Sequence, residues 1–540
     1  MQGDYSAAVA ALNTLQSNFA IVDAIRKSGK GMNKMAIPEM IEWVKRIGYE
    51  PSDFDKLKAI HVAGTKGKGS TSSFVSSILQ QYTGSLSVKK VGLYTSPHLR
   101  FVRERIQIDN APLSEEMFAK YFFETWNRLE QSAEREGHPD PQSRETKPVY
   151  FRFLTLMALH TYMSEGVDCA VIECGIGGEY DSTNMLVNPS VCGVTSLGID
   201  HTAMLGDTIE SIAWHKAGIF KAGVPALTVP QPAPALAVLK ERAQERQTTL
   251  TLTSVHRSIA SGDITLGLAA DFQKTNASLA IAMAAAHLVK QGVKDLPTPG
   301  DSSSPLPAEF RAGLEQVKLG GRCQVRPDPS HSLTWYIDGG HTLESIEMAG
   351  RWFASHISPS SSSPSSQTKQ PRILIFNQQT RDADSLARRL HSTLATALDA
   401  APPSASSSSS AEASAAAERQ TQRPFTAVIF CTNETYATAG FKPDLASMNT
   451  DSTDVSTLRV QHDLANTWRA VDAAADVRIE RTIEEAIALA RQIASASASD
   501  DKERTQTEAD VKVLVTGSLH LVGGLLEVLE SEDVASSKTT

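Results

Sequence analysis

The stretch that decides the fold is Ala59-Ile60-His61-Val62-Ala63-Gly64-Thr65-Lys66-Gly67-Lys68-Gly69-Ser70. Its first five residues are mostly apolar and predict a short buried strand. Residues 70–81 predict a helix, so the glycine-rich turn lies between a strand and a helix. Glycines let the backbone approach a phosphate group, and a helix N-terminus supplies N–H donors and the positive end of a dipole. The stretch therefore predicts a phosphate-binding loop in an α/β fold.

The loop departs at one position from the common phosphate-loop pattern G-x-x-x-x-G-K-[ST], because Gly69 stands between Lys68 and Ser70. We expect Lys68 to pair with the β- and γ-phosphates, and the hydroxyl of Ser70 or Thr71 to meet magnesium. A glycine-rich turn can also be a tight structural turn and nothing more. Other motifs have to decide between these two interpretations.

Strand-like and helix-like segments alternate through the rest of the chain. Further strands are predicted at 91–94, 105–108, 170–173, 191–196, 333–337, 372–376, 427–430 and 511–515, and a helix at 150–163. Such alternation is typical of a mostly parallel sheet with helices on both faces. The predicted fold class is α/β, with a phosphate-loop domain and a smaller C-terminal domain of Rossmann-like type.

A segment rich in proline, serine and glycine interrupts this alternation near the middle of the chain. We predict an ATP-binding domain over 1–296, a linker over 297–307 and a second domain over 308–540. Serine- and alanine-rich tracts at 358–368, 399–417 and 494–508 are predicted to be disordered surface insertions, because they hold too little apolar surface to fold.

Bulk composition excludes several classes of protein. The chain has 540 residues, with 52 basic and 61 acidic side chains and a net charge of −9, which argues against nucleic acid as the main partner. Its five cysteines are odd in number and lack C-x-x-C spacing, so reduced buried thiols are expected. No run of 18 apolar residues exists, so no transmembrane segment is expected. We expect a cytoplasmic monomer; a mitochondrial form, in the matrix or at the inner membrane, stays open.

Polar side chains follow three of the predicted strands. Ser96, Glu173 and His201 each lie at or just beyond a strand's carboxyl end, where open parallel sheets bind ligands. A hydroxyl, a carboxylate and an imidazole together suit magnesium bridged to phosphate. Taken singly, a buried glutamate can equally be an ion-pair partner, and a single histidine is more often a core or surface residue.

Eight segments in order resemble the folylpolyglutamate synthases of the Mur ligase superfamily, in their eukaryotic branch. They are 63–70, 95–99, 104–106, 150–155, 173–184, 200–201, 215–219 and 338–341. The resemblance is densest over 59–225 and returns over 272–341 and 514–524, whereas the serine-rich tracts are unmatched. The loop of that family carries the same additional glycine before its serine, which accounts for Gly69.

The resemblance implies a set of ATP-binding residues: Gly64, Thr65, Lys66, Gly67, Lys68, Gly69, Ser70, Thr71, Asn276, Arg322 and Asp338. It implies two magnesium sites, the first at Ser70 and the second at Ser96, Glu173 and His201. Lys68, Lys216 and His341 would be catalytic, and Lys216 matches a lysine that the family carbamylates. An unmodified Lys216 that pairs with phosphate is the alternative. A monovalent cation is a further expected cofactor.

The resemblance also implies the substrates, which are ATP, folates with their polyglutamate chains, and L-glutamate. Arg105 would line the folate channel, and Ser518 and His520 fall near the glutamate-binding segment. The terminal γ-carboxylate of the folate would attack the γ-phosphate of ATP, and glutamate would then attack the acyl phosphate. Closure of two domains would exclude water from that intermediate.

Four alternatives stay open at this point. Dihydrofolate synthase performs the same chemistry on dihydropteroate, and a bifunctional enzyme would do both. A non-catalytic nucleotide-binding protein on the same scaffold would not need the intact set of Lys68, Ser70, Ser96, Glu173, His201 and Lys216. A kinase would explain the loop but not Arg322 or the Asp338–His341 segment.

Overall fold

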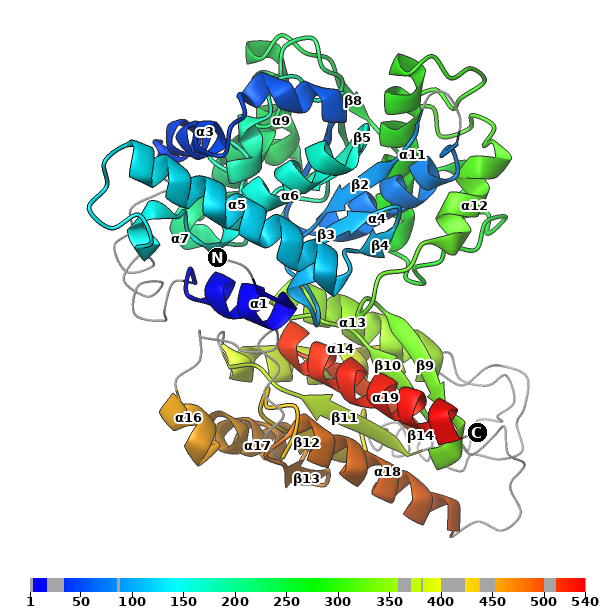
Figure 1. The fold of residues 1–540 in the computed structure, drawn as a ribbon. Coiled ribbons are helices and arrows are strands. Elements are labelled where there is room, and N and C mark those ends of the chain that lie inside the picture. The colour runs from blue at the N-terminus through cyan, green and yellow to red at the C-terminus, as the bar shows by residue number, and fades with distance from the viewer. Residues whose placement is uncertain are drawn as a thin grey trace. The chain divides into compact units, whose positions relative to one another are not determined.

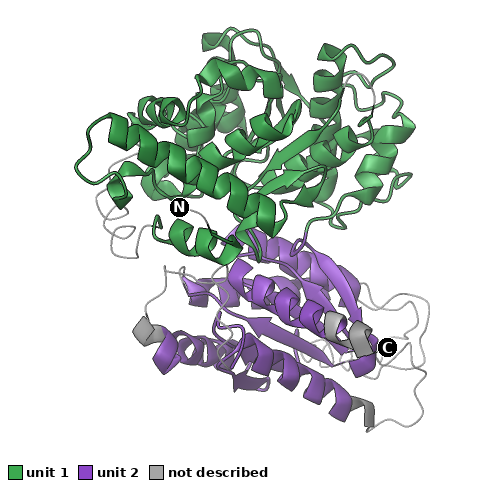
Figure 2. Cartoon of the chain, in the orientation of Figure 1, with its two compact units in different colours: residues 1–319 green, residues 320–540 purple. Residues whose placement is uncertain are grey.

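The computed structural model describes residues 3–16, 34–84, 88–357, 371–379, 382–399, 423–437, 452–499 and 511–539. The chain forms two compact units, Met1–Leu319 and Gly320–Thr540 (Figure 2). Each unit contains one β-sheet with helices packed against it (Figure 1). The predicted α/β class is therefore confirmed.

The sheet of unit 1 has eight strands in the order β4-β3-β2-β5-β1-β6-β7-β8. Only β3 and β4 run antiparallel to their neighbours. The strands are β1 (Ile60–Ala63), β2 (Val91–Tyr94), β3 (Ile106–Ile108), β4 (Ala111–Pro112), β5 (Cys169–Glu173), β6 (Val191–Val194), β7 (Ala226–Thr228) and β8 (Leu250–Leu252). The four strands predicted before residue 180 and the one at 191–196 are confirmed, with shifts of one or two residues at their ends.

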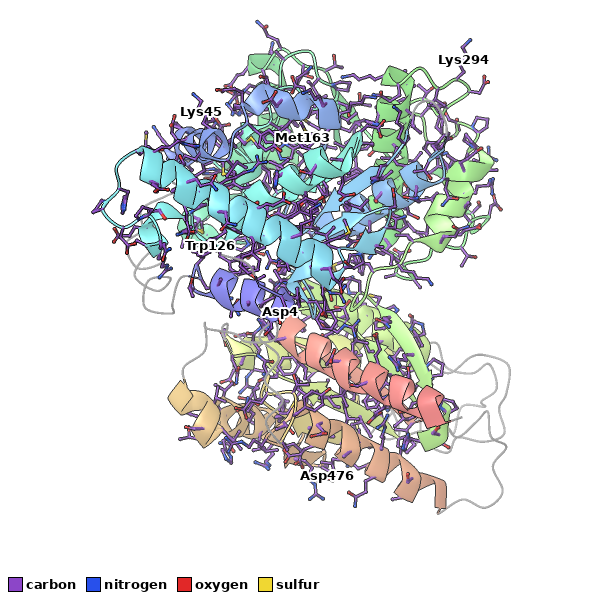
Figure 3. The ribbon with its side chains drawn as sticks, viewed as in Figure 1. Asp4, Lys45, Trp126, Met163, Lys294 and Asp476 are labelled. Carbon is purple, nitrogen blue, oxygen red and sulfur yellow. The ribbon has the colours of Figure 1, made fainter. Side chains whose placement is uncertain are left out.

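Helices surround this sheet. They are α1 (Tyr5–Asn13), α3 (Ala36–Arg46), α4 (Lys68–Gln80), α5 (Glu115–Arg135), α6 (Tyr150–Glu165), α7 (Thr202–Leu205), α8 (Ile209–Ala217), α9 (Ala233–Glu245), α10 (Arg257–Ala260), α11 (Gln273–Lys290) and α12 (Ala308–Gln316). Asp4, labelled in Figure 3, caps the first of them by accepting a hydrogen bond from Ala7 N at 2.9 Å.

The alternation of side chains along β5 shows how both faces of the sheet are buried. Val171 belongs to the core formed with α4 and α11. Ala170 and Ile172 point the other way and belong to the core formed with α5 and α6. Because successive strand residues face opposite sides, a strand covered on both faces has to be apolar throughout. This requirement explains why β1, β2 and β6 also read as short continuous apolar runs.

In the described part of unit 2, the sheet has six strands in the order β13-β12-β11-β14-β10-β9, of which only β9 runs antiparallel to its neighbour. The strands are β9 (Gln324–Asp328), β10 (Leu333–Ile337), β11 (Arg372–Phe376), β12 (Ala427–Phe430), β13 (Asp476–Ile479) and β14 (Val511–Thr516). The helices are α13 (Leu343–Ile357), α14 (Ala383–Asp399), α16 (Ser452–Thr457), α17 (Arg459–Val471), α18 (Ile483–Ser499) and α19 (Leu519–Thr539). All four strands predicted in this half are present.

Two boundaries differ from the predictions. The segment 297–307 lies within unit 1, and the units divide between Leu319 and Gly320. The reason is α12, whose Gly313 packs on α4: Ser77 Oγ donates to Gly313 O at 2.7 Å. A Cβ on Gly313 would lie 2.5 Å from Ile78 Cα, so the two helices touch through their backbones. Residues after 307 therefore continue the first unit.

The serine- and alanine-rich tracts have different outcomes. Residues 358–368 and 400–417 lie outside the described residues. The tract at 494–508 was expected to be disordered throughout, yet α18 extends to Ser499. Alanine has the highest helix propensity, so an alanine-rich end can prolong a helix that packing has already started.

Two further findings concern the cysteines and the length of the apolar helices. All five cysteines are buried and form no disulfide. Within the described ranges, none of the helices combines the length and the apolar character needed to cross a membrane.

Candidate active site

The glycine-rich loop joins β1 to α4, and the helix starts at Lys68, two residues earlier than predicted. Gly64 and Gly67 have φ angles of +149° and +89°, which residues with side chains rarely adopt. A Cβ on Gly64 would overlap the Thr195 hydroxyl, and one on Gly67 would overlap the Asn276 amide. At these two glycines the backbone of the loop packs closely against Thr195, which follows β6, and against Asn276 of α11.

The carboxyl ends of four adjacent strands meet beside this loop, since β2, β5, β1 and β6 are neighbours in the sheet. Glu173, the last residue of β5, is buried, and its Oε2 accepts a hydrogen bond from Ser96 N at 3.2 Å. A Cβ on Gly69 would lie 3.5 Å from the same oxygen. The structure therefore brings Ser96 and Glu173 together at the start of α4.

The segment after β6 packs against the loop itself. Thr65 N and Lys66 N both donate to Ser196 O at 3.0 Å. Lys66 Nζ pairs with Asp200 Oδ2 at 3.1 Å. His201 follows with a left-handed backbone, φ +52°, and an exposed side chain. His201 thus lies at the edge of the sheet where the loop begins, next to Asp200, which pairs with the loop.

Hydroxyl groups cluster at the start of α4. Ser70 Oγ accepts a hydrogen bond from Gln273 Nε2 at 3.2 Å, and Gln273 Oε1 accepts one from Asn276 Nδ2 at 2.8 Å. The Thr71 and Ser72 hydroxyls are buried and have no hydrogen-bond partner in the described part of the chain. Leaving a buried hydroxyl unpaired costs on the order of 1–3 kcal/mol, so these groups suit a polar ligand.

Lys216, near the end of α8, is a buried charged group beside the loop. Its side-chain Nζ donates to Gly64 O at 2.8 Å. Burial lowers the pKa of Lys216 to about 7, and the nearby charge of Lys68 adds to that lowering. Near neutral pH this lysine is therefore partly an uncharged amine, which is the form that can react with carbon dioxide.

A second cluster lies at the carboxyl edge of the sheet in unit 2, where β10 and β14 are neighbours. Asp338 follows β10, and its carboxylate accepts hydrogen bonds from Cys323 N and Gly340 N, each at 2.9 Å. Burial raises the pKa of Asp338, while Arg322 opposes that rise. His341 Nδ1 lies 2.9 Å from Gly339 O. The structure thus brings Arg322, Asp338 and His341 into one site.

The remaining predicted residues lie close to these clusters. Gly517 N donates to Gly340 O at 3.0 Å, which places Ser518 beside the Asp338–His341 segment. His520 is the second residue of α19. Arg105 Nε donates to His98 Nδ1 at 2.9 Å, two residues after Ser96, and the Arg105 guanidinium stacks on Tyr150.

Sequence reasoning missed an amide network at the same edge of unit 2. Asn377 Nδ2 donates to Asn433 Oδ1 at 2.9 Å, and Gln461 Nε2 donates to Asn377 Oδ1 at 2.9 Å. Ser518 Oγ lies 3.3 Å from Asn433 Oδ1, so the network orients a predicted site residue. Asn377 follows a predicted strand directly, and the strand-end rule that selected Ser96 and Glu173 would have found it.

A three-residue ion cluster holds α8 and α9 to the loop after β5. Glu179 Oε2 accepts from Arg242 Nη2 at 2.5 Å, and Glu179 Oε1 lies 3.0 Å from Arg246 Nη2. Glu179 N donates to His215 O at 2.7 Å, directly before Lys216. The Arg242 guanidinium also lies over the ring of Trp214 in α8, with its Cζ 4.6 Å from the ring centroid, so the cluster contacts the helix that carries Lys216.

The chain is similar in sequence to known proteins. No family model matches the chain. A folylpolyglutamate synthase of Saccharomyces cerevisiae (strain ATCC 204508 / S288c) is 44% identical over 535 residues, which cover 98% of this chain and 88% of that protein. The same figures hold for the protein so named in strain YJM789.

Solved structures agree with the fold. The folylpolyglutamate synthase of Mycobacterium tuberculosis complexed with ADP has a TM-score of 0.65 and 20% identity, and the match covers 96% of this chain and 98% of that one. The apo form of the L. casei protein has a TM-score of 0.59 and 22% identity, with coverage of 95% and 100%.

Replacing Glu179 by alanine should lower the free energy of unfolding by roughly 2–4 kcal/mol, because two guanidinium groups lose their shared partner. Urea or thermal unfolding measures the loss. Glu245→Ala is the matched control: its carboxylate also contacts Arg242, at 2.6 Å, but its side chain is 49% exposed. The control should cost less than about 1 kcal/mol. Equal losses in the two variants would contradict the assigned role of Glu179.

Lys216→Met should remove a pH dependence of stability. The folded pKa of about 7 lies below the unfolded value, so the unfolded chain binds more protons between pH 7 and about pH 10. The penalty from charging buried Lys216 is therefore complete below pH 7 and fades as the pH rises. In buffer free of carbon dioxide, the stability gained by Lys216→Met should shrink from pH 7 to about pH 9.

Lys240→Met, at an exposed position of α9, is the control and should show no such trend. A stability difference between wild type and Lys216→Met that stays constant over this pH range would refute the lowered pKa.

Proposed function

The chain belongs to the folylpolyglutamate synthase family, and we propose that its phosphate loop binds ATP in order to activate a folate carboxylate. It is an ATP-dependent ligase that adds L-glutamate to folates. The observation that carries this conclusion is 44% identity to a relative of that name over 98% of the chain. The glycine loop, the buried Glu173 and the buried Lys216 support the detailed roles that follow.

The chemical difficulty is that a carboxylate is a poor acyl donor. In the proposed reaction, an oxygen of the folate γ-carboxylate attacks the γ-phosphate of ATP, and ADP leaves. The amine of L-glutamate then attacks the acyl phosphate, so that an amide forms and phosphate leaves. Two anions have to approach each other, and neutralising their repulsion is the main task of the protein.

We assign this task to backbone N–H groups of the loop and to specific side chains. The backbone N–H groups of residues 64–71 hold the phosphates, since the loop presents no side chain at Gly64 or Gly67. Lys68 would neutralise the β- and γ-phosphates, and Arg322 is the second cation that we assign to the phosphates. Asn276 contacts the nucleotide and also touches Gly67. Asp338, which is buried, contacts the ribose of the nucleotide. His341 lies by the transferred phosphoryl group.

Magnesium fits the donor set at the start of α4. Ser70, or Thr71 in its place, would hold a first ion, and Ser96, Glu173 and His201 a second. Among the described residues, no three His, Cys, Asp or Glu side chains gather in a metal-binding arrangement. Magnesium does not require one, because water and phosphate oxygens provide several of its ligands. When bound, the ion supplies charge neutralisation between ATP and the folate carboxylate.

Lys216 has two candidate roles. Its lowered pKa and its place beside Gly64 favour a carbamylated lysine, which would turn a cation into an anion near the metal. The unmodified lysine instead holds the loop through Gly64 O. The mass of the intact protein, measured with and without bicarbonate, distinguishes the two.

The proposal also covers the substrate-binding residues, the oligomeric state, the cellular compartment and a monovalent cation. Arg105 lines the folate channel, while Ser518 and His520 bind L-glutamate. We also propose that the enzyme acts as a monomer in the cytoplasm, and a monovalent cation stays a prediction. Sedimentation, cell fractionation and potassium dependence of the rate check these three points.

Substrate choice is tested by comparing ligation of glutamate to tetrahydrofolate and to dihydropteroate under the same conditions. The expected result is at least about tenfold higher kcat/KM for tetrahydrofolate, since the chain resembles the polyglutamylating branch. Comparable values would indicate a bifunctional enzyme, and a reversed preference would indicate a dihydrofolate synthase.

Lys68→Ala should lower kcat by about a thousandfold or more while the fold survives, because removing one charge from a phosphoryl-transfer site typically costs several kcal/mol. Release of phosphate in the presence of folate, glutamate and ATP measures the rate. Lys56→Ala, whose side chain is 72% exposed, is the control and should keep wild-type activity. Substantial ligation by Lys68→Ala would contradict the assignment of the loop.

A further inference from the structure

The amide network at the carboxyl edge of the sheet in unit 2 connects a buried anchor to Ser518. Gln461, on α17, and Asn377, which follows β11, are both 0% exposed. Gln461 Nε2 donates to Asn377 Oδ1, and Asn377 Nδ2 donates to Asn433 Oδ1, each at 2.9 Å. Asn433 is half-buried, and Ser518 Oγ lies 3.3 Å from the same Oδ1 atom. The network therefore runs from the interior of unit 2 to a residue that we assign to glutamate binding.

The direction of these hydrogen bonds is fixed at the buried end. An amide donates from its nitrogen and accepts at its oxygen, so turning one amide over reverses its role. Gln461 Nε2 also donates to Cys431 O at 3.2 Å. A backbone carbonyl can only accept, so a reversed Gln461 would place its own oxygen against that carbonyl. Because Gln461 presents its nitrogen, Asn377 has to present its oxygen to Gln461 and its nitrogen to Asn433.

The same direction decides what the Ser518 hydroxyl can do. Asn433 Oδ1 is an acceptor, so the single hydroxyl hydrogen of Ser518 is donated to it. Asn433 Nδ2 donates to Gln379 Oε1 at 3.2 Å, which holds the Asn433 amide in this orientation. A hydroxyl group has one donor and two acceptor positions, and Leu521 N donates to one of the acceptor positions of Ser518 at 3.4 Å. Ser518 therefore has one position left for a ligand, and that position accepts.

We propose that Ser518 accepts a hydrogen bond from the α-amino group of the incoming L-glutamate, and that the amide network gives Ser518 this polarity. The inference deepens the proposed function and rests on it. The amino group is the only donor of L-glutamate, because its two ionised carboxylates can only accept. Asn377, Asn433 and Gln461 are positioning residues, since they act through Ser518.

Such a contact has a consequence for the reaction. The amine of L-glutamate is the nucleophile that attacks the acyl phosphate, and it attacks through its nitrogen lone pair. An acceptor that holds one of its N–H bonds restricts the direction of that lone pair. A hydroxyl that donated to a carboxylate would hold the amino acid without orienting its reacting atom. The polarity of Ser518 therefore decides whether it contributes to orientation of the nucleophile.

The test compares L-glutamate with glutarate, which is the same dicarboxylate without the amino group. The KM for L-glutamate and the inhibition constant of glutarate are measured in the ligation assay with saturating Mg-ATP and tetrahydrofolate. Ser518→Ala should raise the KM for L-glutamate at least about tenfold, because it removes a hydrogen bond to the amino group. The inhibition constant of glutarate should stay within about threefold of wild type, because glutarate offers Ser518 no donor. Ser518→Thr keeps the hydroxyl and should retain most of the wild-type affinity for L-glutamate.

Asn433 provides a matched pair of variants that separates positioning from packing. Asn433→Asp keeps an acceptor oxygen toward Ser518 and should keep the preference for L-glutamate over glutarate. Asn433→Leu, of similar shape, offers no acceptor, so the Ser518 hydrogen becomes available to a carboxylate oxygen. That variant should lose at least about threefold of the preference. Ser392→Ala, at an exposed position of α14 whose hydroxyl donates to Arg389 O at 3.0 Å, is the control and should behave as wild type.

Two outcomes would overturn the inference. If Ser518→Ala raises both constants equally, or neither, Ser518 does not hold the amino group. If Asn433→Leu keeps the full preference for L-glutamate, the amide network does not set the polarity of Ser518, and this comparison holds even where Ser518→Ala ligates too slowly for a KM. The absence of any ligation by the wild-type protein would instead contradict the proposed function, and the inference would fall with it.

Discussion

The close packing of two loop glycines, Gly64 and Gly67, against neighbouring elements is the constraint on which the site depends. Gly64 touches Thr195 and Gly67 touches Asn276, at backbone angles that only glycine adopts readily. The loop therefore cannot move without disturbing the end of β6 or the first turns of α11. Because the loop is fixed in this way, its N–H groups are held at the start of α4, where the helix dipole favours anions.

Three lysines, Lys66, Lys68 and Lys216, lie in or beside that loop. Lys66 has Asp200 as its partner, but Lys68 and Lys216 are close enough for the first to depress the pKa of the second. A triphosphate would relieve this repulsion, so binding of ATP and protonation of Lys216 should be linked. The Glu179 cluster matters for the same reason, because it holds α8 and keeps Lys216 against Gly64 O.

Much of the architecture could be predicted from the sequence. Short apolar runs identified β1, β2, β5 and β6. The strand-end rule placed Ser96 and Glu173 at one edge of the sheet, where Ser96 N donates to Glu173 Oε2 at 3.2 Å. Short or exposed strands such as β8 and β13 gave no such signal, because half-exposed edge strands lack a continuous apolar pattern.

The domain boundary was misplaced for a similar reason. Proline and serine marked an irregular segment near 300, but composition carries no information on which helix packs on which, and Gly313 joins α12 to α4. The strand-end rule would have selected Asn377 itself, but the partners of Glu179 and Asn377 lie 63 and 56 residues away in sequence and carry no local signal. Contacts of that range are set by tertiary packing rather than by local pattern.

The central claim is that the loop uses ATP to activate a carboxylate rather than to phosphorylate a hydroxyl group. Labelling the γ-carboxylate of tetrahydrofolate with oxygen-18 tests it most directly. Because the attacking oxygen leaves with the phosphate, each phosphate released during ligation of glutamate should carry one labelled oxygen. Phosphate without label, or label found in AMP, would contradict an acyl-phosphate intermediate on this loop.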